Sequence, residues 1–313
     1  MTSLRVVFMG TPDFAVPCLD RLVADGHDVA AVVTQPDRPK GRGQKLAPSP
    51  VKEAALGYGL PVLQPEKIRT EEFQAAMAAL APEVVVVVAF GQFLPKAMLE
   101  LPRLGCVNVH ASLLPRYRGA APIHWAVMNG ETTTGITTMY MDTGMDTGDM
   151  ILKAELDIAP DDTTGKVHDR LKELGAAVLS DTLARLADGT APRTPQDGTA
   201  ATYAPLLTRA VERIDWSRPA ATVHNQVRGL SPWPGAYCLH VGRTLKVWRS
   251  ELAATAPGVG QPGRVVAADE TGAVVLTGDG AVRLTEVQPE NRRRMGMGEF
   301  IRGYGLTVGE TLA

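Results

Sequence analysis

The chain has 313 residues, of which 45% are hydrophobic and 21% are charged, and its formal net charge is −2. This length allows two domains with separate cores, and the near-neutral charge gives no global sign of a nucleic-acid partner. The chain starts without a signal-peptide pattern, and no run approaches the roughly 20 apolar residues of a membrane helix, so we expect a cytoplasmic protein with no membrane partner.

Strand-like and helix-like segments alternate through the first part of the chain. Strands are predicted at Leu4–Met9, Asp28–Thr34, Val84–Phe90, Cys106–His110 and Gly135–Tyr140, and helices at Phe14–Ala24, Ser49–Gly57, Glu71–Leu80 and Lys166–Leu186. The third strand is almost purely β-branched, as expected where helices cover both faces of a parallel sheet. This alternation predicts an α/β fold with a doubly wound, mainly parallel sheet.

A change in amino-acid composition at residue 189 predicts a second domain. Residues 189–208 are rich in Pro, Gly, Thr and Ala without periodicity, which indicates a linker between domains at 1–188 and 209–313. Beyond it we expect a helix at Ala220–Arg228 and strands at Thr244–Trp248, Gly263–Ala267, Ala273–Thr277 and Ala281–Val287. Short strands between glycine turns are typical of a small β-barrel. Up to residue 208 there are 19 Lys and Arg against 24 Asp and Glu, and beyond it 13 against 10, so only the second part is net positive.

Three kinds of cofactor site are disfavoured. The three cysteines form no CxxC pair and no metal-ligand spacing, so we expect no metal and no disulfide scaffold. The first turn, Gly10-Thr11-Pro12, has one of the three glycines of a dinucleotide fingerprint, and its proline lacks an amide for phosphate. No GxxxxGK[ST] motif occurs, which argues against ATP hydrolysis.

Two polar side chains interrupt the apolar strand at 106–110. Asn108 and His110 lie two residues apart, so they share one face of the strand, and the segment Ser112–Pro115 and a basic loop follow them. Strand ends of α/β folds are where ligands bind. A simple polar loop cap is an equally good interpretation of this stretch alone.

A second polar segment, MDTGMDTGDM at 141–150, follows the strand at 135–140. Its three carboxylates, from Asp142, Asp146 and Asp149, are spaced by glycines. An EF-hand places a ligand at every second position and ends with Glu, so a calcium loop does not fit. A glycine-jointed loop that presents one carboxylate to a small ligand is favoured over a solvated turn.

A basic loop, QPDRPKGRGQK, follows the second strand. Its cations are Arg38, Lys40, Arg42 and Lys45. Its prolines and glycines predict a segment without regular structure that carries charge away from the body. A solvated loop is one interpretation, and phosphate contact, which the run Arg292–Arg294 would extend, is the other.

Together these motifs resemble the folate-dependent formyltransferase family, and most of all its tRNA-acting members. The resemblance rests on MGTPDFA, TQPDRPKGRG, PSPVK, NVHASLLPRYRGAAPI and MDTGMDTGDM, with IDWS and SPWPGA in the second domain. It implies a Rossmann-like catalytic domain followed by a barrel of the oligonucleotide-binding type.

The resemblance also implies the reaction, which is formyl transfer from 10-formyltetrahydrofolate to the α-amine of methionine on initiator tRNA, as a translation-initiation step. Asn108 would stabilise the oxyanion, together with His110 as imidazolium or through a relayed proton, and Asp146 would hold His110 and help to move protons. The implied folate contacts are Ser112, Leu113, Leu114, Pro115, Phe90, Gln92, Leu94 and Asp142, and the implied tRNA contacts are Arg38, Lys40, Arg42 and Lys45.

The resemblance requires no metal, and we expect a monomer. Three alternatives stay open. The first is a formyltransferase for another amine, such as a sugar nucleotide or glycinamide ribonucleotide. The second is a hydrolase of formyltetrahydrofolate, and the third is a non-catalytic RNA-binding module with a degenerate α/β domain.

Overall fold

A computed structural model describes residues 2–40, 45–253 and 260–313 of the chain. The chain divides into two compact units, and it passes between them several times. Unit 1 consists of Met1–Gly119, Thr134–Leu156 and His168–Tyr203, and unit 2 of Ala120–Thr133, Asp157–Val167 and Ala204–Ala313. The domain boundaries predicted after residues 188 and 208 stay predictions, because compactness alone does not show which segments fold independently.

Unit 1 is built on a seven-stranded sheet with the order β10-β9-β7-β6-β1-β2-β5. Its strands are β1 (Arg5–Gly10), β2 (Asp28–Val33), β5 (Val62–Leu63), β6 (Val84–Val88), β7 (Cys106–His110), β9 (Thr133–Tyr140) and β10 (Met150–Asp157). The pairs from β5 to β7 are parallel, whereas β9 runs antiparallel to β7. The predicted doubly wound, mainly parallel sheet is therefore confirmed, and its direction of winding reverses beside β1.

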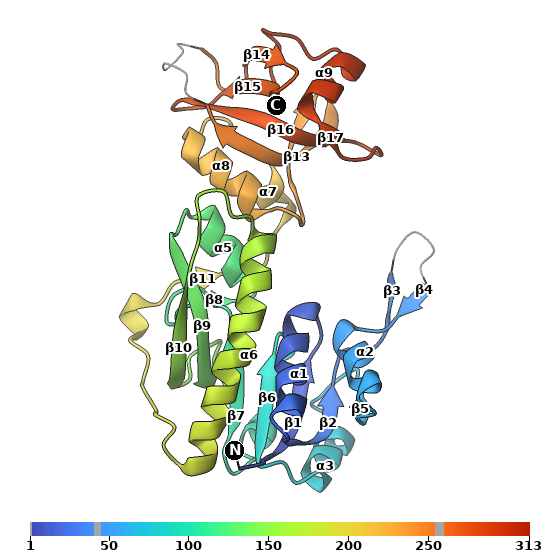
Figure 1. The fold of residues 1–313 in the computed structure, drawn as a ribbon, viewed down its shortest axis with the longest axis vertical. Helices are drawn as coiled ribbons and strands as arrows, with labels where there is room; N and C mark the ends of the chain where they lie inside the picture. The colour runs from blue at the N-terminus through green and yellow to red at the C-terminus, as the bar shows by residue number, and fades with distance from the viewer. Residues whose placement is uncertain (1, 41–44, 254–259) are drawn as a thin grey trace. The chain divides into compact units, whose positions relative to one another are not determined.

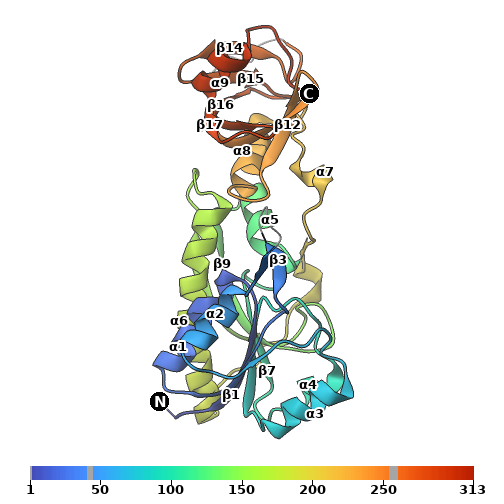
Figure 2. The same ribbon diagram turned by 90° about the vertical axis from the view of Figure 1, so that its right-hand side faces the viewer.

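Helices cover both faces of this sheet (Figure 2). The helices of unit 1 and the one shared with unit 2 are α1 (Val16–Ala24), α2 (Pro50–Gly57), α3 (Glu71–Ala79), α4 (Lys96–Leu99) and α6 (Thr164–Asp188), and η1 (Asp13–Ala15) and η2 (Gly198–Ala200) are short 3-10 turns. α1 and α6 lie on one face and α3 and α4 on the other. Every residue of β6, VVVVV, is buried, which confirms the reading of that run as a doubly covered strand.

Two helix starts follow directly from their sequences. The Ser49 hydroxyl accepts a hydrogen bond from the Lys52 amide, and the Thr70 hydroxyl accepts one from the Phe73 amide, so each caps its helix. Pro50 occupies the first position of α2, where its missing amide costs no hydrogen bond. In the described part of the chain, no helix is both long enough and apolar enough to cross a membrane.

The basic loop departs from its prediction. Arg38–Lys40 (β3) and Lys45–Ala47 (β4) pair as a two-stranded antiparallel ribbon (Figure 1), so the expectation of a segment without regular structure was wrong. Pro39 is tolerated because a two-stranded ribbon has two outer edges, and an amide that points outward has no strand to bond. The residues between these strands, 41–44, lie outside the described residues.

Unit 2 carries a six-stranded antiparallel sheet, which agrees with the small, largely β second domain predicted from the sequence. Its strands are β12 (Ala236–His240), β13 (Arg243–Leu252), β14 (Val265–Asp269), β15 (Gly272–Leu276), β16 (Ala281–Pro289) and β17 (Met295–Gly296). The helices α7 (Arg209–Glu212), α8 (Ala220–Gly229) and α9 (Met297–Tyr304) come from the same part of the chain, and α5 (Pro122–Met128) comes from an earlier one. A small pair, β8 (Arg118–Gly119) and β11 (Tyr203–Ala204), completes the strands.

The core of unit 2 includes α5 although α5 lies far away in the sequence. Met128 belongs to one cluster with Val223, Val227 and Leu230 of the α8 region. The contact between the two helices is close, since a Cβ on Gly229 would lie 2.4 Å from Met128 Cγ. Only glycine allows this approach.

All three cysteines are free and buried. Burial raises the thiol pKa of Cys18, Cys106 and Cys238 from 9.0 to about 12. At pH 8 this shift lowers the reactive thiolate fraction by about a thousandfold. We therefore expect no thiol to react with Ellman's reagent in the native protein over an hour and three to react after denaturation. Rapid labelling of the native protein would contradict the buried positions.

Candidate active site

The polar residues of β7 lie on one face of the sheet. Asn108 and His110 follow Cys106 at intervals of two, and Cys106 packs in the cluster that α3 and α4 cover. Val109 lies on the opposite face, where its methyl group approaches Gly175 of α6. The predicted shared face of Asn108 and His110 is therefore confirmed.

The loop between β9 and β10 brings Asp146 to this pair. Asp146 Oδ1 lies 3.4 Å from Asn108 Nδ2, and Asp146 Oδ2 lies 3.7 Å from His110 Nδ1. Oδ2 also accepts a 2.8 Å hydrogen bond from the main-chain amide of Gly119. The structure thus brings together the three side chains that were predicted to share the chemistry, although they are separated by up to 38 residues.

The hydrogen bonds of His110 define where its ring takes up a proton. Nε2 lies 2.9 Å from the Tyr117 carbonyl oxygen, which only accepts, so Nε2 carries a hydrogen. In the neutral ring Nδ1 then holds the lone pair, and this atom faces the Asp146 carboxylate. The ring is 6% exposed. A buried imidazole with a free lone pair beside a carboxylate can accept a proton, and the carboxylate stabilises the cation that forms.

The segment after β7 turns sharply back onto the sheet. The Ser112 hydroxyl donates to the Arg116 carbonyl, at 2.6 Å, and Thr137 of β9 donates to the Ser112 carbonyl and accepts from the Leu114 amide. Leu114 is fully buried against Met139 and Met150, whereas Leu113 is half-buried. Of the predicted folate contacts in this segment, Leu113 and Pro115 are partly exposed and can contact a ligand. Ser112 and Leu114 are buried and stabilise the turn.

The other predicted folate residues come from two neighbouring loops. Phe90 and Leu94, after β6, are buried in the α3 and α4 layer, and Gln92 accepts a hydrogen bond from the Ile68 amide at 3.4 Å. Asp142 is exposed and caps its own loop, because its Oδ1 accepts from the Gly144 amide and the Thr147 hydroxyl. β6 and β7 are parallel neighbours, so the segments after them leave from the same edge of the sheet.

One member of the site, Gln196, has no signal in the sequence. Gln196 lies in the segment predicted as a linker, yet its amide bonds the main chain of Asp146 and the side chain of Arg118. Residues 194–202 lack the periodicity of a helix or strand, and pairs of this kind form only in the folded chain.

Comparison with known proteins gives the family. Residues 4–183 match the formyl transferase family, and residues 206–305 match the formyl transferase C-terminal domain. The chain belongs to the formyl transferase family. Among curated members of this family, methionyl-tRNA formyltransferases are similar over their full length. That of Moorella thermoacetica is 54% identical and covers 99% of both chains, and that of Bacillus licheniformis is 52% identical and covers 98% of both.

Two solved structures with a bound folate share the fold. HypX from Aquifex aeolicus in complex with tetrahydrofolic acid superposes with a TM-score of 0.65 at 17% identity, over 100% of this chain and 51% of that one. An N-formyltransferase from Helicobacter canadensis, in complex with folinic acid and dTDP-3-aminofucose, gives 0.67 at 18% identity, over 92% and 100%. At these identities the likeness concerns the fold alone.

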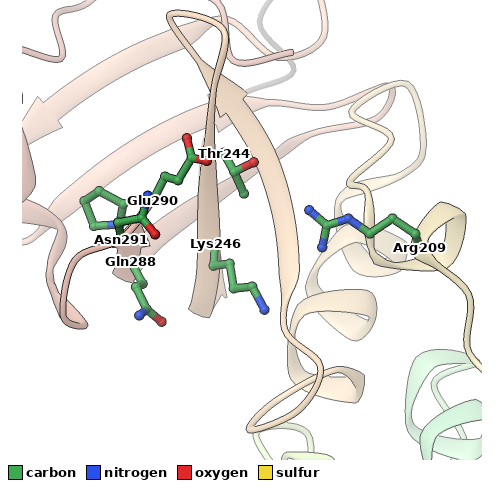
Figure 3. A pocket seen from close by; sticks show the side chains of 7 residues that line it. Arg209, Thr244, Lys246, Gln288, Glu290 and Asn291 are labelled. Carbon is green, nitrogen blue, oxygen red and sulfur yellow. The ribbon is translucent and has the colours of Figure 1, made fainter. Parts of the chain in front are cut away.

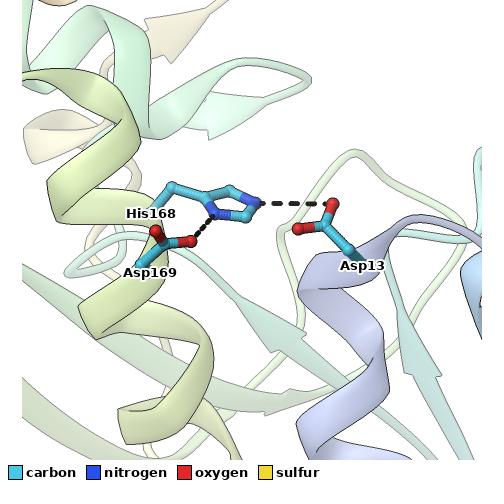
Figure 4. Close-up of side chains that lie close together, drawn as sticks. All are labelled: Asp13, His168 and Asp169. Atoms are coloured by element: carbon cyan, nitrogen blue, oxygen red, sulfur yellow. Dashed lines mark hydrogen bonds and ion pairs between the residues drawn. The ribbon is translucent and has the colours of Figure 1, made fainter. Parts of the chain in front are cut away.

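A second polar cluster in unit 1 of this formyl transferase lies between η1 and α6. Asp13, His168 and Asp169 lie close enough to share a cation (Figure 4). The Lys172 ammonium already lies 3.2 Å from Asp169 and 4.0 Å from Asp13. The His168 hydrogen bond, helped by Lys172, lowers the pKa of Asp169. The Lys172 ammonium therefore offsets part of the negative charge of these two carboxylates.

In unit 2 an open pocket of about 320 Å³ is lined by polar and basic side chains (Figure 3). These are Arg209, Thr244, Lys246, Gln288, Glu290 and Asn291, with Pro289. The Arg209 guanidinium stacks on the Tyr237 ring at 3.8 Å, and Arg294 stacks on Trp248 at 3.5 Å. Arginines that lie on aromatic rings are held in place, with their donors directed sideways.

Proposed function

We propose that this formyl transferase moves the formyl group of 10-formyltetrahydrofolate to the α-amine of methionyl initiator tRNA, in the cytoplasm and as a monomer. The observation that carries the proposal is the joint position of Asn108, His110 and Asp146 in one site, in a chain about half identical to methionyl-tRNA formyltransferases over its full length.

The reaction needs one proton acceptor and one oxyanion donor. The amine nitrogen attacks the formyl carbon, the carbonyl oxygen becomes an oxyanion, and the bond to N10 of the folate then breaks. The amine loses one proton and N10 gains one, so the products are N-formylmethionyl-tRNA and tetrahydrofolate. An α-amine titrates near 8, so much of it is already neutral and a modest base suffices.

The side chains of the site match these two needs. The Asn108 amide is a neutral donor that, among the described residues, makes only the long 3.4 Å hydrogen bond to Asp146, so it can turn to an oxyanion. His110 Nδ1 accepts the amine proton and returns it to N10, and Asp146 stabilises the imidazolium between the two steps. Removal of an oxyanion donor typically costs a hundred- to a thousandfold in rate.

We assign the donor and the acceptor to further surfaces of the chain. We infer that the pterin lies beside Leu113, Pro115 and the loop of Asp142, at the edge of the sheet where β6 and β7 end. The basic ribbon of β3 and β4 and the cations Arg209 and Lys246 of the unit 2 pocket are the surfaces we assign to tRNA phosphates.

The experiment that tests the function is transfer of labelled formyl from 10-formyltetrahydrofolate to methionyl initiator tRNA, with methionyl elongator tRNA as the control. Labelling of the initiator species alone is expected. Transfer to sugar nucleotides or glycinamide ribonucleotide instead would remove tRNA as the acceptor. Release of free formate without any acceptor would indicate a hydrolase.

The Arg38→Ala variant should raise the KM for methionyl-tRNA and leave the KM for the folate donor unchanged. Arg38 is an exposed cation of β3, and its neighbour Asp37 is neutralised by Lys52 at 2.7 Å. Loss of one phosphate contact weakens binding and lowers the salt dependence of KM by about one counterion. Arg42, another implied tRNA contact, lies outside the described residues.

The matched control is Arg69→Ala, which removes an exposed arginine just before α3. It should leave both KM values unchanged. An increase in the folate KM for Arg38→Ala, with no change for tRNA, would contradict the assignment of the ribbon to RNA.

A further inference from the structure

The loop that carries Asp146 is held from outside by one side chain. The Gln196 amide nitrogen lies 2.8 Å from the Asp146 carbonyl oxygen and 2.8 Å from the Gly148 carbonyl oxygen. Its amide oxygen accepts from Arg118 Nε at 3.1 Å and from Arg118 Nη2 at 2.7 Å. Gln196 therefore uses both ends of its amide, and all of its partners belong to the segments that surround the site.

The orientation of this amide follows from its partners. Arg118 only donates hydrogen bonds, and the two carbonyls only accept them, so the oxygen must face Arg118 and the nitrogen must face the loop. Arg118 is 6% exposed and cannot turn away to water without losing a buried bond. The Gln196 amide, which we call the clamp, can therefore make these hydrogen bonds in one orientation only.

The clamped loop has a backbone that needs such support. Asp146 adopts φ +54°, in the left-handed region that side chains other than glycine rarely adopt. A backbone of this kind persists only where surrounding contacts hold it. The carboxylate on this residue is the group that faces Asn108 and His110.

The same segment also holds the other side of the site. The Thr202 hydroxyl accepts a 2.8 Å hydrogen bond from the Tyr117 amide, and the Tyr117 carbonyl is the acceptor of His110. Thr194 pairs through its main chain with Met150, at the end of the Asp146 loop. We name residues 194–202 the strap, because they bond both loops that contact the trio.

We propose that Gln196 is a positioning residue for formyl transfer. Its amide holds the main chain of the Asp146 loop so that the carboxylate stays opposite Asn108 and His110. This inference rests on the proposed function, because the effect of Gln196 is measured as a change in kcat for formyl transfer. Within the described residues, the Gln196 amide contacts Arg118, the sulfur of Met139 and the loop of Asp146, so we expect its effect on transfer to pass through Asp146.

The test uses two variants of the full chain. Gln196→Met keeps the length of the side chain without its hydrogen bonds. Gln196→Glu keeps an acceptor for Arg118 and so preserves folding, but it removes the donor to the two carbonyls. Both should lower kcat roughly ten- to hundredfold, as expected for a small displacement of a catalytic group, with the folate KM within about twofold of wild type.

A second measurement needs no substrate. The Gly119 amide donates to Asp146 Oδ2, so its hydrogen exchange reports where the carboxylate is. Both Gln196 variants should speed this exchange. The control is Gln226→Met in unit 2, since the Gln226 amide also donates to two main-chain carbonyls, those of Val211 and Arg213. It should change neither kcat nor the exchange of Gly119.

The outcomes separate this inference from the proposed function. Unchanged kcat in both Gln196 variants, or an equal loss of kcat in Gln226→Met, would overturn the positioning role. A wild-type protein without transfer activity would refute the proposed function. The exchange of Gly119 would then decide alone whether Gln196 holds Asp146, and unchanged exchange would overturn that as well.

Discussion

The Asn108→Ala variant should lower kcat by about a hundred- to a thousandfold and leave the KM for 10-formyltetrahydrofolate within about twofold of wild type. The amide donor has little to bond in the ground state beyond a 3.4 Å contact with Asp146. Its stabilising hydrogen bond forms when the carbonyl oxygen acquires charge, so its removal acts on the transition state alone.

Steady-state kinetics with each substrate varied in turn will measure this separation. The Asn225→Ala variant is a suitable control, because the Asn225 oxygen accepts from Arg228 at 2.8 Å in unit 2 and Asn225 is not part of the trio. It should lose some stability and keep kcat. If Asn108→Ala raises KM and keeps kcat, Asn108 binds substrate and is not the oxyanion donor.

The His110→Gln variant should lower kcat by a factor of about a hundred to ten thousand, the range expected when a general base is removed. Glutamine keeps a donor for the Tyr117 carbonyl but has no nitrogen that takes up a proton beside Asp146. The residual activity should rise with pH through the titration of the amine near 8, because the substrate must then lose its proton to water.

This pH profile distinguishes a chemical role from a structural one. The control is His240→Gln in unit 2, where His240 Nε2 lies 3.1 Å from a Glu310 carboxylate oxygen. This histidine has a carboxylate partner as His110 does, but it lies in unit 2, so kcat and its pH profile should stay as in wild type. A His110→Gln variant whose rate falls equally at every pH would refute the base role.

The central strands and long helices could be predicted from the sequence because their patterns are local. β7 begins and ends at the predicted residues, and α6 extends the predicted 166–186 helix by two residues at each end. The apolar run of β6 and the helical spacing of α3 each depend on a few neighbouring residues. The antiparallel sheet of unit 2 followed from its glycine turns for the same reason.

The basic ribbon and α5 show where such patterns fail. Pro39 and the glycines at 41 and 43 argued against strands, but pairing with Leu46 across the ribbon overrides that local preference. The helix at Pro122–Met128 is short and directly follows a polar loop, so its sequence alone did not indicate a helix. Its partner α8 lies about a hundred residues later in the chain. Tertiary contacts decided both segments.

The residues of the site also fall into two groups, those that the sequence predicted and those that it did not. Asn108 and His110 were found because they share one face of a strand, Asp146 because it lies in a glycine-jointed loop after a strand, and all three because the family motif names them; the structure brings them together. Gln196 and the Gly119 amide were not found, because a side-chain clamp and a main-chain donor leave no trace in composition or spacing. A motif indicates the groups that react, and the groups that hold them become visible only in the fold.

The interleaved path of the chain has a consequence for its synthesis on the ribosome. The α5 segment, with Trp125 and Met128, leaves the exit tunnel well before α8 and the strands that complete its core. Domains that are continuous in sequence close one after another during translation, but this nascent chain must keep an apolar helix exposed until the last strands are made. We therefore expect newly made chains that stop short of β16 to be held by chaperones through α5, while unit 1 is already folding.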